Sequence, residues 1–366
     1  MSSSERPDVV VIGAGLVGLS VARGVARKGY SVLVTGTRRQ GFASAAAAGL
    51  LAPTIEAGSG DTLRFALAAR DRYPSFLAEL REETGTDVPL HFHGILRLPD
   101  SEADGAELSR DAGPFARWLS TAEAAELEPA LAAPFGALWH HQDGMVDNVA
   151  LLGALERSAA GLGVQRRAVE VMALSPSRQS VELALADGAR LSCGTVVIAA
   201  GAWASLLDGL PRPLPVTPLR GQMLALAGAS LRRPVYAMGG YVAPRLEEGF
   251  TIAGSTSEDV GFSPGTTPEA LTRFEEIARR LLPARPPVPL RSWSGLRPMT
   301  PDGLPILGPD PDVPTVVYAC GHSRNGILMA PLTADVVAAL LAGEPMPHDI
   351  TVFAIDRFTS ERSQNP

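Results

Sequence analysis

The stretch "VVVIGAGLVGLS" near the start of the chain constrains the fold more than any other feature. An apolar, β-branched run over residues 8–13 stops at glycines, helical spacing follows over residues 16–28, and strand character returns in "GYSVLV". Gly13, Gly15 and Gly18 fit the pattern GxGxxG, whose glycines close a turn and let a pyrophosphate approach the backbone. A lone match is weak, but its place between a strand and a helix favours dinucleotide binding.

The segment expected to form the second strand, "SVLVTGTRR", lacks a feature that normally accompanies this motif. A dinucleotide-binding unit usually ends that strand with an Asp or Glu that hydrogen-bonds the adenosine ribose. Thr35, Gly36 and Thr37 occupy that place here. Either the glycine motif is fortuitous, or the nucleotide is held without the usual acid.

Length, charge and cysteine content narrow the class of protein. The 366 residues predict about two domains, and a formal net charge of −7 argues against a nucleic-acid binder, which would carry a basic face. Cys193 and Cys320 form no CxxC pair, so neither a disulfide framework nor a zinc site is expected. The N-terminal residues show no leader pattern, and no run reaches the ~18 apolar residues of a membrane span. We therefore expect a soluble, cytoplasmic protein.

Beyond the first unit the chain alternates between two kinds of pattern. "GFASAAAAGLLAP" is rich in small residues, which suits backbone packed closely against a ligand. Ser120 and Glu123 form a predicted capping box inside a mixed module, and a turn at residues 187–188 joins two alternating strands. A buried strand over residues 195–200 is closed by Gly201. Helical spacing returns at residues 63–84, 268–282 and 325–342.

Segments typical of a nucleotide-binding sheet thus occur at the start, in the middle and at the end of the chain. A single glycine fingerprint in such an interrupted chain favours FAD, because NAD enzymes tend to keep the nucleotide domain contiguous. We expect a mixed α/β fold in which a Rossmann-like, glutathione-reductase-type FAD domain is interleaved with an antiparallel-sheet substrate domain. The predicted FAD-domain segments are residues 1–85, 146–215 and 294–366, and the substrate-domain segments are residues 86–145 and 216–293.

Seven motifs carry a resemblance to a known family. In chain order they are "VVVIGAGLVGLS", "SAAAAGLLAP", "PLRGQML", "YVAPR", "GSTSEDVGF", "GLRPMTPDGLPILG" and "GHSRNGILMAPLTA". Their order resembles the glycine oxidase branch, linked to thiazole synthesis for thiamine, of the FAD-dependent D-amino-acid oxidase family. The likeness runs over nearly the whole chain, and "EDVGF" favours this branch over sarcosine oxidases and the larger D-amino-acid oxidases.

The resemblance implies a set of FAD contacts. The glycine turn would hold the diphosphate, the small-residue segment would line the ribityl and flavin region, the backbone of Val169 would meet the adenine, and the final motif would wrap the pyrimidine end of the flavin. The residues concerned are Gly13, Ala14, Gly15, Leu16, Val17, Gly18, Gly36, Thr37, Ala43, Ser44, Ala48, Gly49, Leu50, Val169, Gly201, His322, Ser323, Arg324, Asn325, Gly326, Ile327 and Leu328.

Three side chains are candidates for the catalytic site. In the family the Arg of "GLRP", here Arg297, binds the substrate carboxylate, and a planar guanidinium suits a bidentate carboxylate contact. A surface salt bridge is the alternative reading of Arg297. Tyr241 in "YVAPR" resembles a tyrosine near the substrate, although a strand tyrosine can also simply pack. Arg324 either faces the active site or pairs with an acid nearby, and Ser257 is expected on the pocket wall, where its small size leaves room for more than glycine.

The stretch "GHSRNG" is expected to open a helix beside the flavin. Reduced flavin carries negative charge near N1 and the C2 carbonyl, and a helix N-terminus placed there stabilises this charge by about 0.3 to 2 kcal/mol. An ordinary helix with Asn325 as its N-cap explains the same residues.

Several sites are expected to be absent. His140 and His141 would point to opposite faces of a strand, so no metal site is predicted. Sarcosine-type relatives attach flavin through a cysteine in the motif that matches "GLRPMTPD", which contains no thiol here, so FAD should be non-covalent and Cys320 a small buried hydrophobe. The only lysine, Lys28, is expected on the surface of the first helix.

Family members commonly carry an acid at the position of Gly36, so one charge-assisted hydrogen bond to the ribose, worth about 1.5–3 kcal/mol, should be missing. The hydroxyl groups of Thr35 or Thr37, or Arg38 and Arg39 stacked on the adenine, are candidates to offset this loss.

The function implied is oxidation of glycine, or of another small amine-bearing carboxylate, by hydride transfer to flavin N5. Hydrolysis of the imine would give the 2-oxo acid and ammonia, and dioxygen, the expected acceptor, would become hydrogen peroxide. The alternatives are a D-amino-acid dehydrogenase that reduces a quinone, a sarcosine-type oxidase, a tRNA-modifying flavoenzyme and a non-catalytic flavoprotein. Expected partners are a small amino acid and further copies of the chain, as a homotetramer, without nucleic acid or a membrane span.

Overall fold

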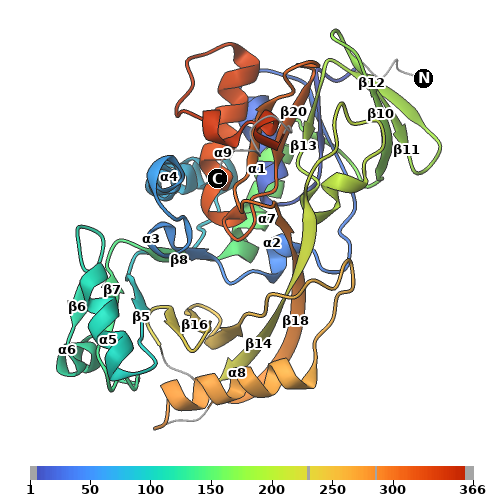
Figure 1. Ribbon diagram of the computed structural model, residues 1–366. Coiled ribbons are helices and arrows are strands. Elements are labelled where there is room, and N and C mark those ends of the chain that lie inside the picture. Colours follow the sequence, from blue (N-terminus) through green and yellow to red (C-terminus); the bar gives the residue numbers. More distant parts are fainter. Residues whose placement is uncertain (1–5, 229–230, 285–286, 359–366) are drawn as a thin grey trace.

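The computed structural model describes residues 6–228, 231–284 and 287–358, which form an upper and a lower lobe (Figure 1). The first residues of the predicted segment 1–85 and the last of the segment 294–366 lie outside the described residues. The expected mixed α/β architecture is confirmed, with the glycine motif in the upper lobe.

The upper lobe is built on a six-stranded sheet of order β19-β20-β13-β1-β2-β9. All neighbouring strands are parallel except β19, which runs antiparallel at the edge. Its strands are β1 (Val9–Ile12), β2 (Val32–Thr35), β9 (Gln165–Arg167), β13 (Thr195–Ile198), β19 (Ile306–Pro309) and β20 (Val316–Cys320). The apolar runs of β1, β13 and β20 are buried on both faces, as parallel strands covered on two sides must be.

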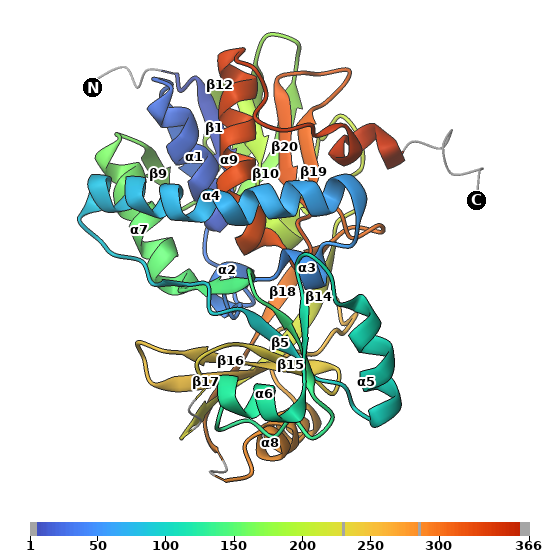
Figure 2. The same ribbon diagram turned by 90° about the vertical axis from the view of Figure 1, so that its left-hand side faces the viewer.

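Helices cover one face of this sheet and a small sheet covers the other. The helices are α1 (Leu16–Arg27), α4 (Gly60–Thr84), α7 (Asn148–Gly161) and α9 (Gly326–Ala342). Figure 2 shows the long helix α4 crossing in front of α1 and α9. The opposite face is covered by β10 (Val171–Pro176), β11 (Val181–Leu185) and β12 (Arg190–Cys193), of which β11 and β12 are joined at the predicted Asp187–Gly188 turn.

The lower lobe is built on an eight-stranded sheet of order β18-β14-β17-β16-β15-β5-β7-β6. These are β5 (Ile95–Arg97), β6 (Arg117–Leu119), β7 (Ala137–His140), β14 (Thr217–Ala227), β15 (Val235–Ala237), β16 (Gly240–Arg245), β17 (Phe250–Gly254) and β18 (Val288–Met299). The sheet is antiparallel apart from one parallel pair, β5 with β15, which no hairpin connects. Helix α8 (Pro268–Leu281) packs on it through Phe274 and Ile277. The mixed module predicted around Ser120 and Glu123 supplies β5, β6 and β7, so this module extends the sheet.

Short elements join the lobes. A three-stranded sheet is formed by β3 (Leu50–Leu51), β8 (Gly144–Val146) and β4 (Leu90–His91), with α2 (Ala43–Ala46) and α3 (Pro53–Glu56) beside β3 in sequence. Helices α5 (Glu102–Leu108) and α6 (Thr121–Leu127) flank β6, and α6 begins at the predicted Ser120–Glu123 capping box. Single 3₁₀ turns span Ser109–Asp111, Gly201–Leu206, Thr351–Phe353 and Ile355–Phe358.

The predicted domain division can be compared with these sheets. Every strand of the six-stranded sheet comes from residues 1–85, 146–215 or 294–366. The boundary at residues 293 and 294, however, falls inside β18, and the one at residues 145 and 146 falls inside β8. Both strands link the lobes, so the domain division stays a prediction.

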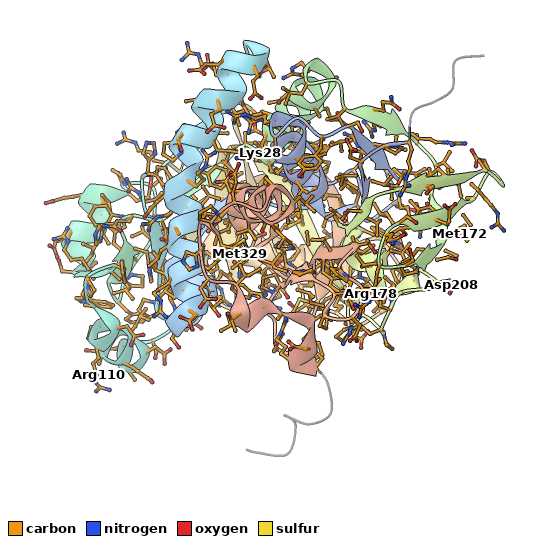
Figure 3. All side chains as sticks on the ribbon, turned by 90° about the horizontal axis from the view of Figure 1, so that it is seen from above. Lys28, Arg110, Met172, Arg178, Asp208 and Met329 are labelled. Atoms are coloured by element: carbon orange, nitrogen blue, oxygen red, sulfur yellow. The ribbon has the colours of Figure 1, made fainter. Side chains whose placement is uncertain are left out.

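Apolar side chains are buried on both faces of the six-stranded sheet and between the eight-stranded sheet and α8. Figure 3 labels Met329, which is fully buried on α9, and Met172, which is 52% exposed at the outer margin. Lys28 is exposed as predicted and pairs with Glu344 through contacts of 2.5 and 2.7 Å. Within the part of the chain that the structure describes, no helix combines the length and apolar character needed to cross a membrane.

Candidate active site

A cavity of about 980 Å³ lies where the two lobes meet. Its walls come from the glycine turn, the segment around α2, the start of α9 and the strands β14, β16 and β18. This volume exceeds what a small amino acid needs, and ligand sites of up to about 1,000 Å³ accommodate extended ligands. The cavity therefore has room for a cofactor together with a small substrate.

Most of the predicted site residues line this one cavity although they come from distant parts of the sequence. They are Gly13, Ala14, Gly15, Leu16, Val17, Thr37, Ala43, Ser44, Ala48, Gly49, Leu50, Gly201, Tyr241, Ser257, Arg297, His322, Ser323, Arg324, Asn325, Gly326 and Ile327. The fold thus brings together the glycine turn, the small-residue segment and the two C-terminal motifs.

Four predicted cofactor residues do not line the cavity, each for a local reason. A Cβ on Gly18 would collide with the carbonyl of Gly13, so this glycine lets α1 pack on its own turn. Leu328 is buried in the helical core, and Val169 packs against the core between the two upper sheets. Gly36 lies behind the glycine turn, where a Cβ would stand 3.6 Å from the Cα of Gly13.

The glycine turn is shaped to receive a phosphate. Gly13 adopts φ +121°, and a Cβ there would overlap the backbone of Ala199 on the neighbouring strand. Helix α1 has no side-chain cap at its N-cap residue, Gly15. Leu16 N donates to Ser44 Oγ at 3.0 Å, which ties the turn to α2. Uncapped N–H groups and the helix dipole at such an end favour an anion.

The small-residue segment packs its backbone tightly against β18. A Cβ on Gly295 would stand 2.7 Å from Cβ of Ala46, and Trp293 Nε1 donates to the carbonyl of Ala46 at 2.8 Å. Asn148 Nδ2 donates to the carbonyl of Ser44 at 2.7 Å from α7. Larger side chains here would separate the segment from the strand, which explains the run of alanines.

Of the groups expected to replace the missing ribose acid, three are engaged by other side chains, whereas the buried Thr35 hydroxyl has no hydrogen-bond partner among the described residues. Thr37 Oγ1 donates to Glu170 at 2.7 Å, and Arg39 Nε donates to the same carboxylate at 2.5 Å. Arg38 pairs with Glu156 at 2.6 Å. The sequence-based analysis missed Glu170, because it follows a neighbouring strand of the sheet, β9, rather than β2.

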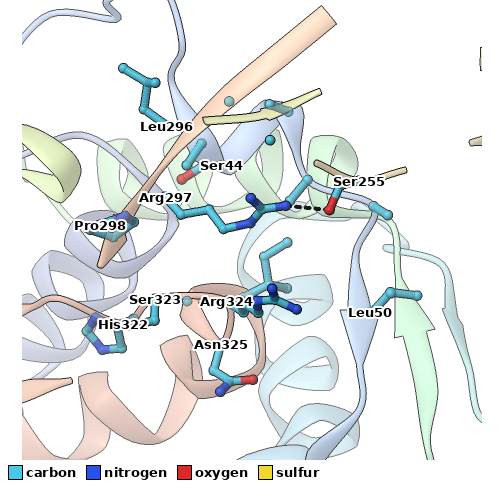
Figure 4. Close-up of a pocket in the computed structure, with 18 of the residues that line it drawn as sticks. Ser44, Leu50, Ser255, Leu296, Arg297, Pro298, His322, Ser323, Arg324 and Asn325 are labelled. Carbon is cyan, nitrogen blue, oxygen red and sulfur yellow. Dashed lines mark hydrogen bonds between the residues drawn. The ribbon is translucent and has the colours of Figure 1, made fainter. Parts of the chain in front are cut away.

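Arg297 projects from β18 across the cavity wall (Figure 4). Its Nη1 donates to the carbonyl of Thr256 at 3.0 Å and its Nη2 to Ser255 Oγ at 2.5 Å. Burial lowers the pKa of this guanidinium, yet an arginine keeps its charge in proteins. Within the described ranges, no ion pair joins Arg297 to a carboxylate, so the surface salt bridge considered for it is not formed there. A partly buried cation without an acid favours an anionic ligand.

Two tyrosines form the wall next to Arg297. Tyr236 and Tyr241 are cross-strand partners in β15 and β16, and their ring centroids lie 5.6 Å apart. Tyr241 Oη donates to Met223 Sδ at 3.3 Å, and burial raises the pKa of this phenol to about 12. Tyr236 Oη donates to Glu56 Oε1 at 2.9 Å. Both phenols therefore stay protonated at neutral pH and can act as donors.

Arg324 lines the cavity and also pairs with an acid, so the two alternatives considered for this residue occur together. Its Nη1 lies 3.6 Å from Glu56 Oε2, and its Nη2 donates to Ser257 Oγ at 3.1 Å. The Arg324 side chain is 51% exposed, against 18% for Glu56. Figure 4 shows Arg324 on the loop before α9, facing the strand that carries Arg297.

The turn before α9 is held against the end of β18. Ser323 N donates to the carbonyl of Pro298 at 3.0 Å, and Ser323 adopts φ +52°, an uncommon value for a residue with a side chain. His322 Nε2 lies 3.1 Å from Thr333 Oγ1, and burial lowers the pKa of His322 to about 4. The imidazole is therefore neutral at pH 7. Asn325 is the N-cap residue, without a side-chain cap hydrogen bond.

Sequence reasoning missed several cavity residues. Glu56 follows the motif "SAAAAGLLAP" by a few residues, and Ser255 opens "GSTSEDVGF", so both were within reach of the quoted motifs. Met223 lies in the quoted motif "PLRGQML". Tyr236 and Trp203 carry no local signal, because only strand pairing and loop packing bring them to the wall.

The cysteines and His140, which the sequence analysis singled out, are buried side chains. No group of three or more His, Cys, Asp or Glu residues that could hold a metal ion occurs among the described residues. Cys193 and Cys320 are free and buried, and burial raises the pKa of each thiol to about 12. His140 is buried on β7, where its Nδ1 lies 2.7 Å from Thr54 Oγ1.

Comparisons with known proteins agree with this site. A family model described as "FAD dependent oxidoreductase" (DAO) matches residues 8–340. The "Bifunctional protein ThiO/ThiG" of Synechocystis sp. is 36% identical over 96% of this chain, which spans about half (54%) of that relative's length. The "Glycine oxidase" of Geobacillus kaustophilus is 33% identical over 97% of this chain and 98% of its own.

A solved structure shows the same arrangement of the chain. The crystal structure of glycine oxidase from Geobacillus kaustophilus superposes with a TM-score of 0.89 at 31% sequence identity. The match covers 97% of this chain and 99% of that structure.

Proposed function

The chain belongs to the FAD-dependent oxidoreductase (DAO) family, and on that premise we propose that it oxidises glycine or another small amine-bearing carboxylate. The product is the imine, which water hydrolyses to a 2-oxo acid and ammonia. The observation that carries this proposal is Arg297, a guanidinium without an acid partner in the described chain, at the wall of the cavity that also contains the glycine turn.

The residues present fit FAD. Gly13 lets the turn pack against the backbone of Ala199, and the start of α1, whose N-cap residue Gly15 has no side-chain cap, opens onto the same cavity. We assign the diphosphate to this turn and the flavin to the region between α2 and the start of α9, with Thr37 and Glu170 on the ribose side. FAD is held without a covalent bond in this proposal, since both thiols are buried and protonated.

Bound FAD supplies the two-electron acceptor for the substrate C–H bond. Arg297 binds the substrate carboxylate through its two Nη atoms, and the hydrogen bonds to Ser255 and Thr256 fix its plane. Tyr241, whose phenol stays protonated, donates a second contact from β16. Holding the carboxylate in one place orients the α-carbon, and orientation of this kind accounts for a large part of many enzymatic accelerations.

The start of α9 contributes electrostatics. Asn325, Gly326 and Ile327 line the cavity at the positive end of a helix that runs to Ala342. This end favours negative charge inside the cavity by about 0.3–2 kcal/mol. His322 adds no charge there, because burial keeps it neutral.

We further propose dioxygen as electron acceptor, a homo-oligomeric state and a cytoplasmic location. Lys28 lies on the surface and pairs with Glu344, so a cation near the reacting centre must be an arginine, such as Arg324. The two free cysteines suit a reducing compartment. Val288 and Leu290, 61% and 56% exposed on the edge strand β18, offer apolar surface for a second copy.

The test is anaerobic reduction of the purified yellow protein by glycine, sarcosine and D-alanine, followed through loss of the oxidised flavin absorbance. We expect bleaching by at least one of them, glycine first. Stoichiometric hydrogen peroxide in air supports an oxidase, whereas bleaching without peroxide supports a dehydrogenase. Protein that binds FAD but is bleached by none of these amines contradicts the proposal.

A further inference from the structure

Three carboxylates line the cavity. Glu258 pairs with Arg220, and Asp100 accepts a hydrogen bond of 3.1 Å from Met238 N. The third is Glu56, which the proposed reaction has not used. It is the last residue of α3, lines the cavity and has a side chain only 18% exposed. Glu56 also lies close to Arg297. Burial lowers the pKa of the Arg297 guanidinium, and the negative charge of Glu56 opposes part of this lowering. A carboxylate and a guanidinium thus line the same cavity.

The two oxygens of Glu56 are in different situations. Oε1 accepts a hydrogen bond of 2.9 Å from Tyr236, whose pKa burial raises well above its ordinary value, so this donor persists over the usual pH range. Oε2 lies 3.6 Å from Arg324 Nη1, which is beyond hydrogen-bond distance. Arg324 instead donates to Ser257 Oγ at 3.1 Å. Within residues 6–228, 231–284 and 287–358, no group therefore donates a hydrogen bond to Oε2.

The helix that carries Glu56 is fixed by contacts of another residue. Thr54, two residues before Glu56 on the same short helix, donates to Asp143 Oδ2 at 2.7 Å and lies 2.7 Å from His140 Nδ1. These contacts anchor α3 to the strands β7 and β8. Glu56 thus lies on an anchored helix, is oriented by one phenol and has one oxygen beside the cavity to which no described residue donates. Such a carboxylate can accept a hydrogen bond from a ligand.

We propose that Glu56 Oε2 accepts a hydrogen bond from the substrate amine, so that the cavity binds an amino acid at two points, the carboxylate on Arg297 and the amine on Glu56. This inference rests on the proposed function and specifies its substrate class: an α-amino or α-alkylamino carboxylate with at least one N–H. Carboxylates without an amine still bind Arg297 but find no partner at Glu56.

The competing explanation is that Glu56 only balances the charge of Arg324. The two roles differ in what a Glu56→Gln variant does to ligands with and without an amine. Gln keeps the size of the side chain and an acceptor for Tyr236, so the cavity is expected to stay intact. A loss that affects only amine-bearing ligands marks recognition, whereas a loss shared by all carboxylates marks a structural role.

The experiment uses the holoenzyme and two probes of similar size. Acetate is titrated into the oxidised protein and its dissociation constant is read from the shift of the flavin absorbance. Glycine is mixed anaerobically, and its apparent dissociation constant is read from the concentration dependence of flavin reduction. Glu247→Gln, at a half-exposed carboxylate that contacts His91, is the matched control.

In Glu56→Gln we expect glycine binding to weaken by at least about tenfold, the loss of one charge-assisted hydrogen bond, with acetate binding within threefold of the wild type or tighter. Tyr236→Phe, which frees the carboxylate without removing it, should weaken glycine binding less and leave acetate unchanged. Equal losses for both probes, or glycine binding within threefold of the wild type, overturn the inference. Where sarcosine or D-alanine bleaches the wild type and glycine does not, that amine replaces glycine as the probe. Wild-type protein that none of the three amines bleaches overturns the proposed function itself, and the inference with it.

Discussion

Glu170 is the residue that most changes how the nucleotide end of the cavity is understood. Thr37 lines the cavity and donates to this carboxylate, and Arg39 binds it as well. An acid thus lies beside Thr37 after the next strand of the sheet, β9, and not at the end of β2. The guanidinium of Arg39 is the first cause of the lowered pKa of Glu170, so the carboxylate is ionised at neutral pH.

We predict that Glu170→Gln weakens FAD binding by about tenfold, because one charge-assisted interaction near the ribose side, worth about 1.5 kcal/mol, is lost. The dissociation constant is measured by fluorescence as FAD is added to apoprotein. Glu156→Gln, which removes the partner of Arg38 instead, is the control and should leave the constant within threefold. An unchanged constant in Glu170→Gln shows that this carboxylate plays no part in holding the nucleotide.

Asp143 gives a second residue-scale prediction, for stability against pH. Burial raises its pKa to about 6, while Thr54 and Arg70 act in the opposite direction. Between about pH 4 and 6 the folded protein therefore holds a proton that the unfolded chain has released, and this carboxyl contributes less stability as the pH rises. The buried His140, with a pKa lowered to about 4, contributes the opposite slope.

In Asp143→Asn the carboxyl contribution disappears but that of His140 stays. The free energy of unfolding of the variant minus that of the wild type should therefore increase by on the order of 2–3 kcal/mol as the pH rises from 4 to 6. Above about pH 6 the two stability profiles should be parallel. Urea unfolding at several pH values measures this difference. Parallel profiles from pH 4 upward contradict the buried, protonated state of Asp143.

At the scale of elements, the pairing of β14 with β18 decides where Arg297 can lie. Gly221 faces Gly295 across the pair, and a Cβ on Gly221 would overlap the guanidinium of Arg297. Gly221 thus leaves room for the Arg297 guanidinium, whereas Gly295 on the paired strand leaves room for Ala46 of α2. Neither "PLRGQML" nor "GLRP" shows this alone, because the relation exists only between strands.

Gly221→Ala should therefore displace Arg297 while leaving the nucleotide end intact. We expect the apparent dissociation constant for glycine to rise by at least about tenfold, with the FAD content and absorbance spectrum unchanged, since a side chain displaced by an ångström loses charged hydrogen bonds. Gly161→Ala, at the end of α7 with open space around it, is the control. Unaltered glycine binding in Gly221→Ala shows that Arg297 does not act from this position.

Other element-scale features were accessible from sequence. The helix expected over residues 16–28 is α1, and the one expected over residues 325–342 is α9, because apolar spacing and terminal glycines both mark them. Strand pairing between distant segments was not accessible. The parallel contact of β5 with β15, and the position of Tyr236 beside Tyr241, follow from packing rather than from any local pattern.

At the scale of the whole molecule, the cavity is formed by segments that the sequence keeps far apart. The glycine turn, α2 and the start of α9 bring the upper lobe to it, and β14, β16 and β18 bring the lower lobe (Figure 1). Motifs could identify Arg297, Tyr241 and Arg324, since each lies in a recognisable stretch. They could not identify Glu56 as the facing acid, because its meaning depends on the distance to Arg324 and the donor from Tyr236.

The central claim is that Arg297 binds the carboxylate of the molecule that reduces the bound FAD. Anaerobic rapid mixing of glycine with wild-type protein and with Arg297→Met tests it most directly. We predict a loss of glycine affinity of at least about 100-fold, since two charge-assisted hydrogen bonds of about 1.5–3 kcal/mol each disappear, with FAD binding unchanged. Glycine that reduces the variant with a near wild-type dissociation constant contradicts the account.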